Sequence, residues 1–176
     1  MPERDPEIQR LLDCQAIHNC LMRYSRGLDR RDRKVTESIY WPDAVDDHIT
    51  YSGDVRGFLE YSFKFMEGMR TSHMLLNNLI DFDSPTLARS ETYYIGYHDI
   101  PGPVGREDFF MGGRYLDVME KRGSEWRIKK RVLTCDWYTR APSVATWGSG
   151  LLESLKTRGE PGPDDPLYWF FKDKKD

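Results

Sequence analysis

Apolar side chains recur at every third or fourth position near the start of the chain, which predicts a helix over residues 5–29. The stripe consists of Ile8, Leu11, Leu12, Ile17, Leu21, Tyr24 and Leu28. Asp5 is placed to cap this helix, and Pro6 suits its first turn. Asp29 directly follows the stripe, so its carboxylate is placed to reach into a cavity at the helix end.

Two more helices are predicted before residue 70. Residues 33–39 form a short one, and residues 40–43, which include Pro42, interrupt the pattern. Residues 44–51 then form a short strand or extended loop that contains His48. Asp54 suits the cap of a third helix that runs to about Met69.

Strict alternation of side chains predicts a β-hairpin over residues 71–98. The turn lies at residues 83–86, where Pro85 suits the first central position. The numbers of facing residues should sum to 169 or 171, which places His73 diagonal to His98 or directly opposite it. Small residues at 90, 92 and 96 share this face and leave room beside the two histidines, so we interpret it as the wall of a pocket.

Two further strands are predicted over residues 109–121 and 126–137. The second places Arg127, Lys129 and Arg131 on one face, which predicts a basic face. Residues 141–176 break the regular pattern, apart from a short helix at residues 151–156 and an aromatic cluster at residues 167–171. We expect this tail to dock on the domain or on a neighbouring subunit, because an exposed aromatic cluster would be a sticky patch.

The order of these elements predicts an α+β fold. Helices on one side of a curved, mainly antiparallel sheet make a cone-shaped barrel with a cavity between the layers. We expect residues 1–140 to form this domain and residues 141–176 to form the C-terminal tail.

Composition narrows the possible partners. The net charge is −3 with both signs interspersed, so neither a nucleic-acid surface nor a membrane patch is expected. The polar start, residues 1–5, does not resemble a signal peptide. Cys14, Cys20 and Cys135 lack the spacing of metal ligands, so we expect reduced thiols in a cytoplasmic protein and no metal site.

Several segments, taken in order, resemble one family. They are residues 16–29, 43–45, 71–73, 113–117 and 126–131. Together they resemble the SnoaL-like, or polyketide cyclase-like, branch of the nuclear transport factor 2-like superfamily, which has a cystatin-like fold. The similarity covers roughly residues 8–138 and is greatest to the scytalone dehydratases, bile acid 7α-dehydratases and hexachlorocyclohexane dehydrochlorinases. It implies a cofactor-independent lyase, often a trimer, that works with a His–Asp pair.

The resemblance also implies roles for particular residues. His73 corresponds to the family's base and Asp29 to its carboxylate partner, while Tyr24, His98 and Arg131 match further site residues. Leu28 departs from the pattern, because scytalone dehydratases have a tyrosine there. The expected ligand contacts are His48, Tyr51, Phe63, Met66, Asn77 and Tyr94.

These residue types suit an elimination reaction. A neutral imidazole at His73 can take a proton from carbon, and the Asp29 carboxylate would fix its tautomer. Tyr24 would stabilise developing charge, and His98 or Arg131 would assist the leaving group. The expected substrate is a hydrophobic cyclic small molecule that loses water, and a homo-oligomer (trimer or dimer) is expected without any cofactor.

Other interpretations stay open at this point. An isomerase of the ketosteroid type needs the same base but no leaving-group acid. A non-catalytic subunit, such as the small subunit of a ring-hydroxylating dioxygenase, would use the same cone for binding or assembly alone. Individually, Asp29 would then cap the next helix, Tyr24 would belong to the core, and Arg131 would be an exposed or ion-paired strand residue.

Overall fold

The computed structural model describes residues 5–172, which form four α-helices, six strands and one 3₁₀ turn. In chain order the elements are α1 (Pro6–Asp29), α2 (Arg33–Ser38), β1 (Tyr40–His48), β2 (Tyr51–Asp54), α3 (Val55–Phe65), β3 (Arg70–Ser84), β4 (Leu87–Pro101), β5 (Arg106–Arg122), β6 (Glu125–Pro142), η1 (Gly150–Leu152) and α4 (Pro166–Phe170). Most of the polar start of the chain, residues 1–4, lies outside this described part.

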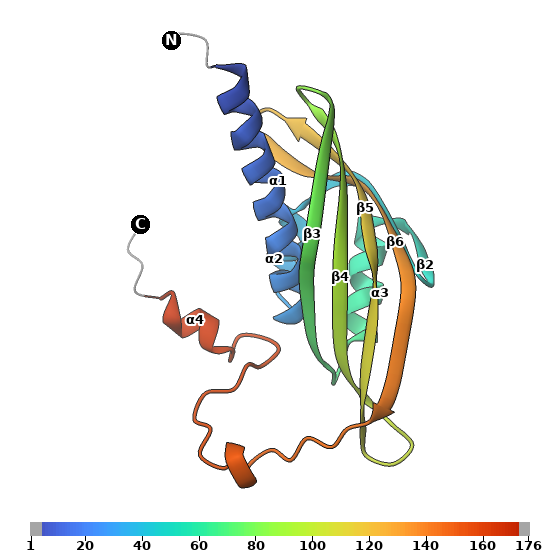
Figure 1. Ribbon diagram of the computed structural model, residues 1–176, viewed down its shortest axis with the longest axis vertical. Helices are drawn as coiled ribbons and strands as arrows, with labels where there is room; N and C mark the ends of the chain where they lie inside the picture. The colour runs from blue at the N-terminus through green and yellow to red at the C-terminus, as the bar shows by residue number, and fades with distance from the viewer. Residues whose placement is uncertain (1–4, 173–176) are drawn as a thin grey trace.

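The six strands form one curved sheet in the order β2-β1-β6-β5-β4-β3. Neighbouring strands are antiparallel except for β1 and β6, which pair in parallel. Helix α1 lies along β3, and α3 lies across the sheet behind β4 and β5 (Figure 1). The α+β cone predicted from the sequence is therefore confirmed.

Side-chain caps set the helix starts as the sequence predicts. The Asp5 carboxylate accepts the Glu7 backbone N–H at 2.8 Å, and the Asp54 carboxylate accepts that of Gly57 at 2.9 Å. The end of α3 differs from the prediction, since the helix stops at Phe65 instead of Met69.

Strand β1 also begins earlier than expected, at Tyr40. Pro42 lies inside it, where the pairing with β6 is irregular between Tyr40 and Val45. A proline is tolerated there because the ladder needs no N–H from it.

The apolar stripe of α1 is buried only in its second half. Ile17, Leu21, Tyr24 and Leu28 are buried against the sheet. Ile8, Leu11 and Leu12 in the first half are 52%, 70% and 46% exposed. The first turns of α1 therefore carry an apolar surface that the described part of this chain does not cover.

Irregular pairing in β3 and β6 changes which side chains face the inside of the cone. In β3 the register shifts between Leu75 and Asn78, so Asn78 points inward and Asn77 is exposed. In β6 the register shifts at Lys129, because Val118 pairs with Lys130 while Met119 pairs with Ile128. Strict alternation places Asn77 on the pocket wall, and this prediction is wrong because the bulge adds one residue.

The bulge at Lys129 also means that the basic face predicted for β6 does not form. Beyond the Lys129 bulge, Arg131 lies on the inner side and is completely buried. The Lys129 ammonium instead lies outside, within 2.6 Å of the Asp43 carboxylate. Arg131 and Lys129 therefore belong to different faces.

The tail contacts the domain through polar groups near the end of α1. Asp165 lies 3.2 Å from the Arg30 guanidinium, and Glu160 accepts from Arg70 at 2.7 Å. The segment swings away from the sheet and returns beside α1 (Figure 1). Only a 3₁₀ turn forms where the sequence predicts a helix at residues 151–156, and Trp169 and Phe170 remain 58% and 68% exposed. No helix within residues 5–172 is long and apolar enough to cross a membrane.

Candidate functional site

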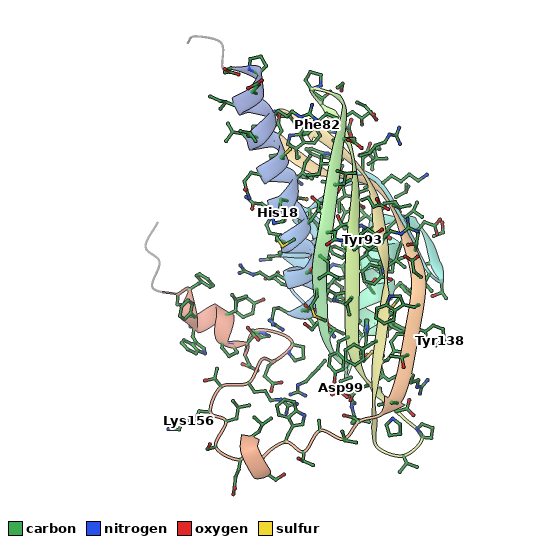
Figure 2. The ribbon with its side chains drawn as sticks, viewed as in Figure 1. His18, Phe82, Tyr93, Asp99, Tyr138 and Lys156 are labelled. Carbon is green, nitrogen blue, oxygen red and sulfur yellow. The ribbon has the colours of Figure 1, made fainter. Side chains whose placement is uncertain are left out.

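A pocket of about 690 Å³ lies between α3 and the inner face of the sheet. Its walls are predominantly apolar, and three histidines reach them. The lining comprises Leu28, His48, Ile49, Thr50, Tyr61, Ser62, Phe65, Met66, Met69, His73, Tyr94, His98, Ile100, Pro101, Phe109, Met111, Tyr115, Leu133, Cys135, Tyr138 and Arg140. The fourth histidine, His18, lies exposed on α1 (Figure 2).

Asp29 and His73 meet at one wall of this pocket. The imidazole Nδ1 lies 2.7 Å from Asp29 Oδ1, and the backbone N–H of His73 donates to Oδ2 at 2.9 Å. Burial alone would raise the pKa of Asp29, but the hydrogen bonds from His73 and Thr71 outweigh it and hold this pKa below its usual value. A carboxylate can only accept, so Nδ1 carries the hydrogen and Nε2 is left as the basic nitrogen.

The end of α1 is fixed by Arg31, which adopts a left-handed backbone conformation with φ of 55°. That conformation is unfavourable for a residue other than glycine. The Arg31 guanidinium offsets the cost, because it donates to the carbonyls of Met66 and Met69 and to the Thr71 hydroxyl. Thr71 in turn donates to Asp29 Oδ1 at 2.9 Å. This chain of contacts holds the carboxylate against β3.

His98 lies beside His73, with ring centroids 5.3 Å apart in an edge-to-face arrangement. The strand register sums to 169 here, since His73 faces Gly96 and Thr71 faces His98. The diagonal arrangement of the two histidines is the one that forms. Burial, followed by the neighbouring His73, lowers the pKa of His98 to about 3, so this ring is neutral at neutral pH.

Gly96 makes the close approach of the two rings possible. A Cβ at this position would lie 3.2 Å from His98 Cε1 and 3.8 Å from the His73 ring. Ser90 and Thr92, which share the face further along β4, are engaged by the Asn78 amide at 2.9 and 2.8 Å instead of lining the pocket.

A second histidine–carboxylate pair borders the same pocket. His48 Nδ1 lies 3.2 Å from Asp46 Oδ1, and the Tyr40 hydroxyl donates to Asp46 Oδ2 at 2.7 Å. His48 and Asp46 are adjacent on one face of β1 because side chains alternate along a strand. Asp46 is completely shielded from solvent, whereas the His48 side chain is 16% exposed.

Tyr24 and Arg131 lie behind the pocket wall and not on it. The Arg131 guanidinium is sandwiched between the rings of Tyr24 and Tyr115, at 4.1 and 4.2 Å from their centroids. It donates to both carboxylate oxygens of Asp117 at 2.7 Å. Neither Tyr24 nor Arg131 has any exposed surface, so the structure does not place them where a ligand in this pocket would touch them.

The expected ligand contacts divide into two groups. His48, Met66 and Tyr94 line the pocket. Phe63 packs against the core, the Tyr51 hydroxyl donates to the Asp54 carbonyl, and Asn77 is exposed. These three do not line the pocket, as strand β2 and the β3 bulge turn Tyr51 and Asn77 away from it.

Sequence reasoning missed the far end of the pocket. Tyr138 and Arg140 line it because β6 continues to Pro142, whereas the predicted strand ends at residue 137, and because a second register shift at Asp136 changes the alternation again. Unbroken alternation places Leu133 and Cys135 on the opposite face, but both line the pocket beyond the Lys129 bulge. Among the described residues, no group of three or more histidine, cysteine or acidic side chains is arranged to hold a metal ion.

Comparison with solved structures finds the same fold. A putative scytalone dehydratase from Novosphingobium aromaticivorans aligns with a TM-score of 0.67 at 22% identity, over 76% of this chain and 90% of that one. A hexachlorocyclohexane dehydrochlorinase, LinA-type3, from Novosphingobium barchaimii aligns with a TM-score of 0.69 at 18% identity, over 80% of this chain and 98% of that one. A protein of unknown function from Mycobacterium tuberculosis aligns with a TM-score of 0.64 at 20% identity, over 75% of this chain and 76% of that one.

Comparison with curated protein sequences gives no significant match. The sequence model of the SnoaL-like domain family, however, matches residues 9–132, which include most of α1, the Asp29–His73 contact and the inner strands of the cone. On this match, which covers well over half of its length, the chain belongs to the SnoaL-like domain family.

Proposed function

We propose that this protein is a cofactor-independent lyase that removes water from a hydrophobic cyclic small molecule. The observation that carries the proposal is the 2.7 Å contact between Asp29 and His73 at the wall of an apolar pocket. The names of two structural neighbours, a putative scytalone dehydratase and a dehydrochlorinase, are in keeping with elimination chemistry.

His73 is the base in the proposed reaction. Its Nε2 takes a proton from a carbon next to a carbonyl, and the Asp29 carboxylate stabilises the imidazolium that forms. Because Asp29 is held by Thr71 and by the His73 backbone N–H, the carboxylate keeps its position while the charge on the ring changes. Proton transfer by a positioned base is worth about 10²–10⁴-fold in rate.

The walls of the pocket favour a flat, apolar ligand. Tyr94 and Tyr115 stack on one another with centroids 4.5 Å apart, and both line the pocket. Met66, Met69 and Met111 add flexible apolar surface that adapts to different shapes. The volume of about 690 Å³ lies in the usual range of small-molecule sites.

The open pocket favours an enzyme over a purely structural subunit. A subunit used only for assembly is expected to fill its cone with side chains, whereas this cone is hollow and carries a histidine held by a carboxylate. An isomerase would use the same base, and what separates it from a dehydratase is a group that protonates the departing oxygen.

The test uses a bicyclic β-hydroxy ketone of the tetralone type, which becomes a fluorescent naphthol on losing water. We expect the wild-type chain to accelerate naphthol formation and His73→Gln to lose about 10²–10⁴-fold of that acceleration. His18→Gln, on the exposed side of α1, is the matched control and should keep full activity. Equal rates for wild type and His73→Gln would contradict the proposed function.

We further propose that the chain is a cytoplasmic homo-oligomer, a trimer or dimer, in which residues 1–140 form the domain and the tail docks on it or on a neighbour. The support is exposed apolar surface on α1 at Ile8, Leu11 and Leu12, and on the tail at Trp169 and Phe170. Analytical ultracentrifugation of the full chain tests this, and a monomer at micromolar concentration would contradict it.

A further inference from the structure

We propose that His48, held by Asp46, is the acid that donates a proton to the departing hydroxyl, in the same pocket as the His73 base. This inference rests on the proposed function and adds to it a second catalytic residue on a different strand. It assigns the pocket two histidine–carboxylate pairs with opposite tasks.

The geometry of His48 suits a proton donor. Its Nδ1 is engaged by Asp46 Oδ1 at 3.2 Å, and the ring lines the pocket, which leaves Nε2 as the nitrogen available to a ligand. The ring packs against Phe58 with centroids 4.9 Å apart, and Tyr115 lies 6.2 Å away on the pocket side. The orientation of the imidazole is therefore fixed from several directions.

Asp46 is built to stabilise positive charge on that ring. It has no exposed side-chain surface, and both of its oxygens are occupied, one by His48 and the other by the Tyr40 hydroxyl. Burial raises the pKa of Tyr40 well above its usual value, so this hydroxyl keeps its proton and donates. A carboxylate that is hydrogen-bonded to one ring nitrogen holds the imidazole in place and stabilises the positive charge that a proton on Nε2 brings.

The other candidates for this task are less suitable. Arg131 is completely buried between two tyrosine rings and does not line the pocket. His98 lines the pocket but sits directly beside His73, with its Nδ1 buried and without a hydrogen-bond partner. A second positive charge next to the His73 imidazolium would be unfavourable. His48 is on β1, whereas the base is on β3, so the two proton transfers take place at separate positions.

The elimination proceeds through two proton transfers. His73 Nε2 takes the proton from the carbon beside the carbonyl, a carbon–carbon double bond forms, and the carbon–oxygen bond breaks. The departing oxygen takes the proton from His48 Nε2 and leaves as water. His73 then releases its proton to solvent and His48 takes one up, which restores both rings.

The experiment compares two leaving groups on the same ring system. The first probe is the bicyclic β-hydroxy ketone described above, and the second is its acetate ester. Both give the same naphthol, but acetate departs as a stable anion and needs no proton. We expect His48→Gln to lower the rate with the hydroxy ketone by about 10²-fold or more and to lower the rate with the acetate far less.

Two further variants separate the possible outcomes. Asp46 is a positioning residue that acts through His48. Asp46→Asn should therefore also lower the rate with the hydroxy ketone more than the rate with the acetate, by a smaller factor than His48→Gln does. His73→Gln should lose activity on both probes, because the base is needed whichever group departs. If His73→Gln keeps activity on both probes, the proposed function fails. If His73→Gln is inactive on both but His48→Gln affects both equally or neither, only the present inference is overturned.

Imidazole nitrogen signals give a measurement that does not depend on turnover. In long-range nitrogen–proton spectra of the full chain, addition of the naphthol product should shift the Nε2 signal of His48, identified by its loss in His48→Gln. The His18 signals serve as the internal reference. Binding of the naphthol that shifts the signals of His73 and leaves those of His48 unmoved would overturn the inference.

Discussion

The Asp29 carboxylate holds His73 at two points, the ring nitrogen Nδ1 at 2.7 Å and the backbone N–H at 2.9 Å. The last residue of α1 thus fixes both the side chain and the backbone of one residue in β3. A change in this carboxylate is therefore expected to affect both catalysis and the packing of α1 on the sheet.

Asp29→Asn removes the charge but keeps the shape of the side chain. We expect the rate with the β-hydroxy ketone to fall by about 10²–10⁴-fold, because the imidazolium loses its stabilising anion. The loss of charge-assisted hydrogen bonds should also lower the free energy of unfolding by about 1.5–3 kcal/mol, measured by urea denaturation. Asp47→Asn, at an exposed position on β1, is the matched control and should change neither quantity. An Asp29→Asn variant with wild-type activity would contradict the role of the pair.

Arg131 is expected to contribute to stability. Asp117→Leu alone leaves a buried guanidinium without its carboxylate and should lower the free energy of unfolding by about 3–5 kcal/mol. The double variant Asp117→Leu/Arg131→Met removes both charges and should lose less than the single variant does. If the double variant has lost turnover while remaining well folded by circular dichroism, Arg131 has a direct part in the reaction and this interpretation is wrong.

Stability should depend on pH through His98. Its pKa is about 3 in the folded chain and 6.5 in the reference state, so below pH 6.5 the unfolded chain binds a proton that the folded chain does not. The free energy of unfolding is therefore highest above pH 6.5 and falls as the pH decreases towards 3, by up to about 1.4 kcal/mol per pH unit. Urea denaturation of wild type and His98→Phe at several pH values between 6.5 and 3 measures this pH dependence. If the free energy of unfolding falls equally steeply with pH in both proteins, His98 is not a neutral buried residue.

The turn after His48 carries a strained residue. Ile49 has φ of 54°, although it is β-branched and 59% exposed. Because the left-handed conformation costs about 1–2 kcal/mol for such residues, Ile49→Gly should raise the free energy of unfolding by about 1 kcal/mol. Thr50→Gly, at the next position of the same turn, is the control and should lower it by about 0.5–1 kcal/mol. A thermal unfolding series measures both, and a destabilised Ile49→Gly would show that the strain is absent.

Crowding between the two adjacent histidines can be tested at Gly96. A methyl group there would lie 3.2 Å from the His98 ring and 3.5 Å from Met111, so one of the neighbours must move. We expect Gly96→Ala to fold but to lose about 10-fold or more in turnover, since displacements of about 1 Å at a reacting group are costly. Gly123→Ala, in the turn between β5 and β6, is outside the pocket and should leave turnover unchanged.

The meeting of Asp29 and His73 could be predicted because both residues depend on regular patterns. One residue ends an amphipathic helix and the other sits on an alternating strand, and the family resemblance connects them. The wrong assignments arise where a strand is irregular. A bulge has no reliable signal in a single sequence, so strict alternation places Asn77 inside and Leu133 outside.

Whether Tyr24 and Arg131 contact a ligand could not be predicted from the sequence, for a different reason. Their positions match the family pattern, but whether such a pair reaches a ligand depends on the packing of neighbouring rings. Here Tyr115, which alternation alone cannot distinguish from other inward residues, closes over the guanidinium. The length of β6 could not be predicted either, and the last residues of this strand bring Tyr138 and Arg140 to the pocket.

The bulge at Lys129 holds one residue more than regular pairing of β5 with β6 requires. Deleting that one residue would leave Ile128 facing Met119 and Lys130 facing Val118 in unbroken alternation, so Leu133 and Cys135 would stay on the inner surface. Asp29 and His73 lie on α1 and β3 and would keep their own backbone setting. One codon lost at this point would thus leave the inner lining of the cone intact, whereas an extra residue within the regular stretch after Arg131 would turn later side chains to the other face.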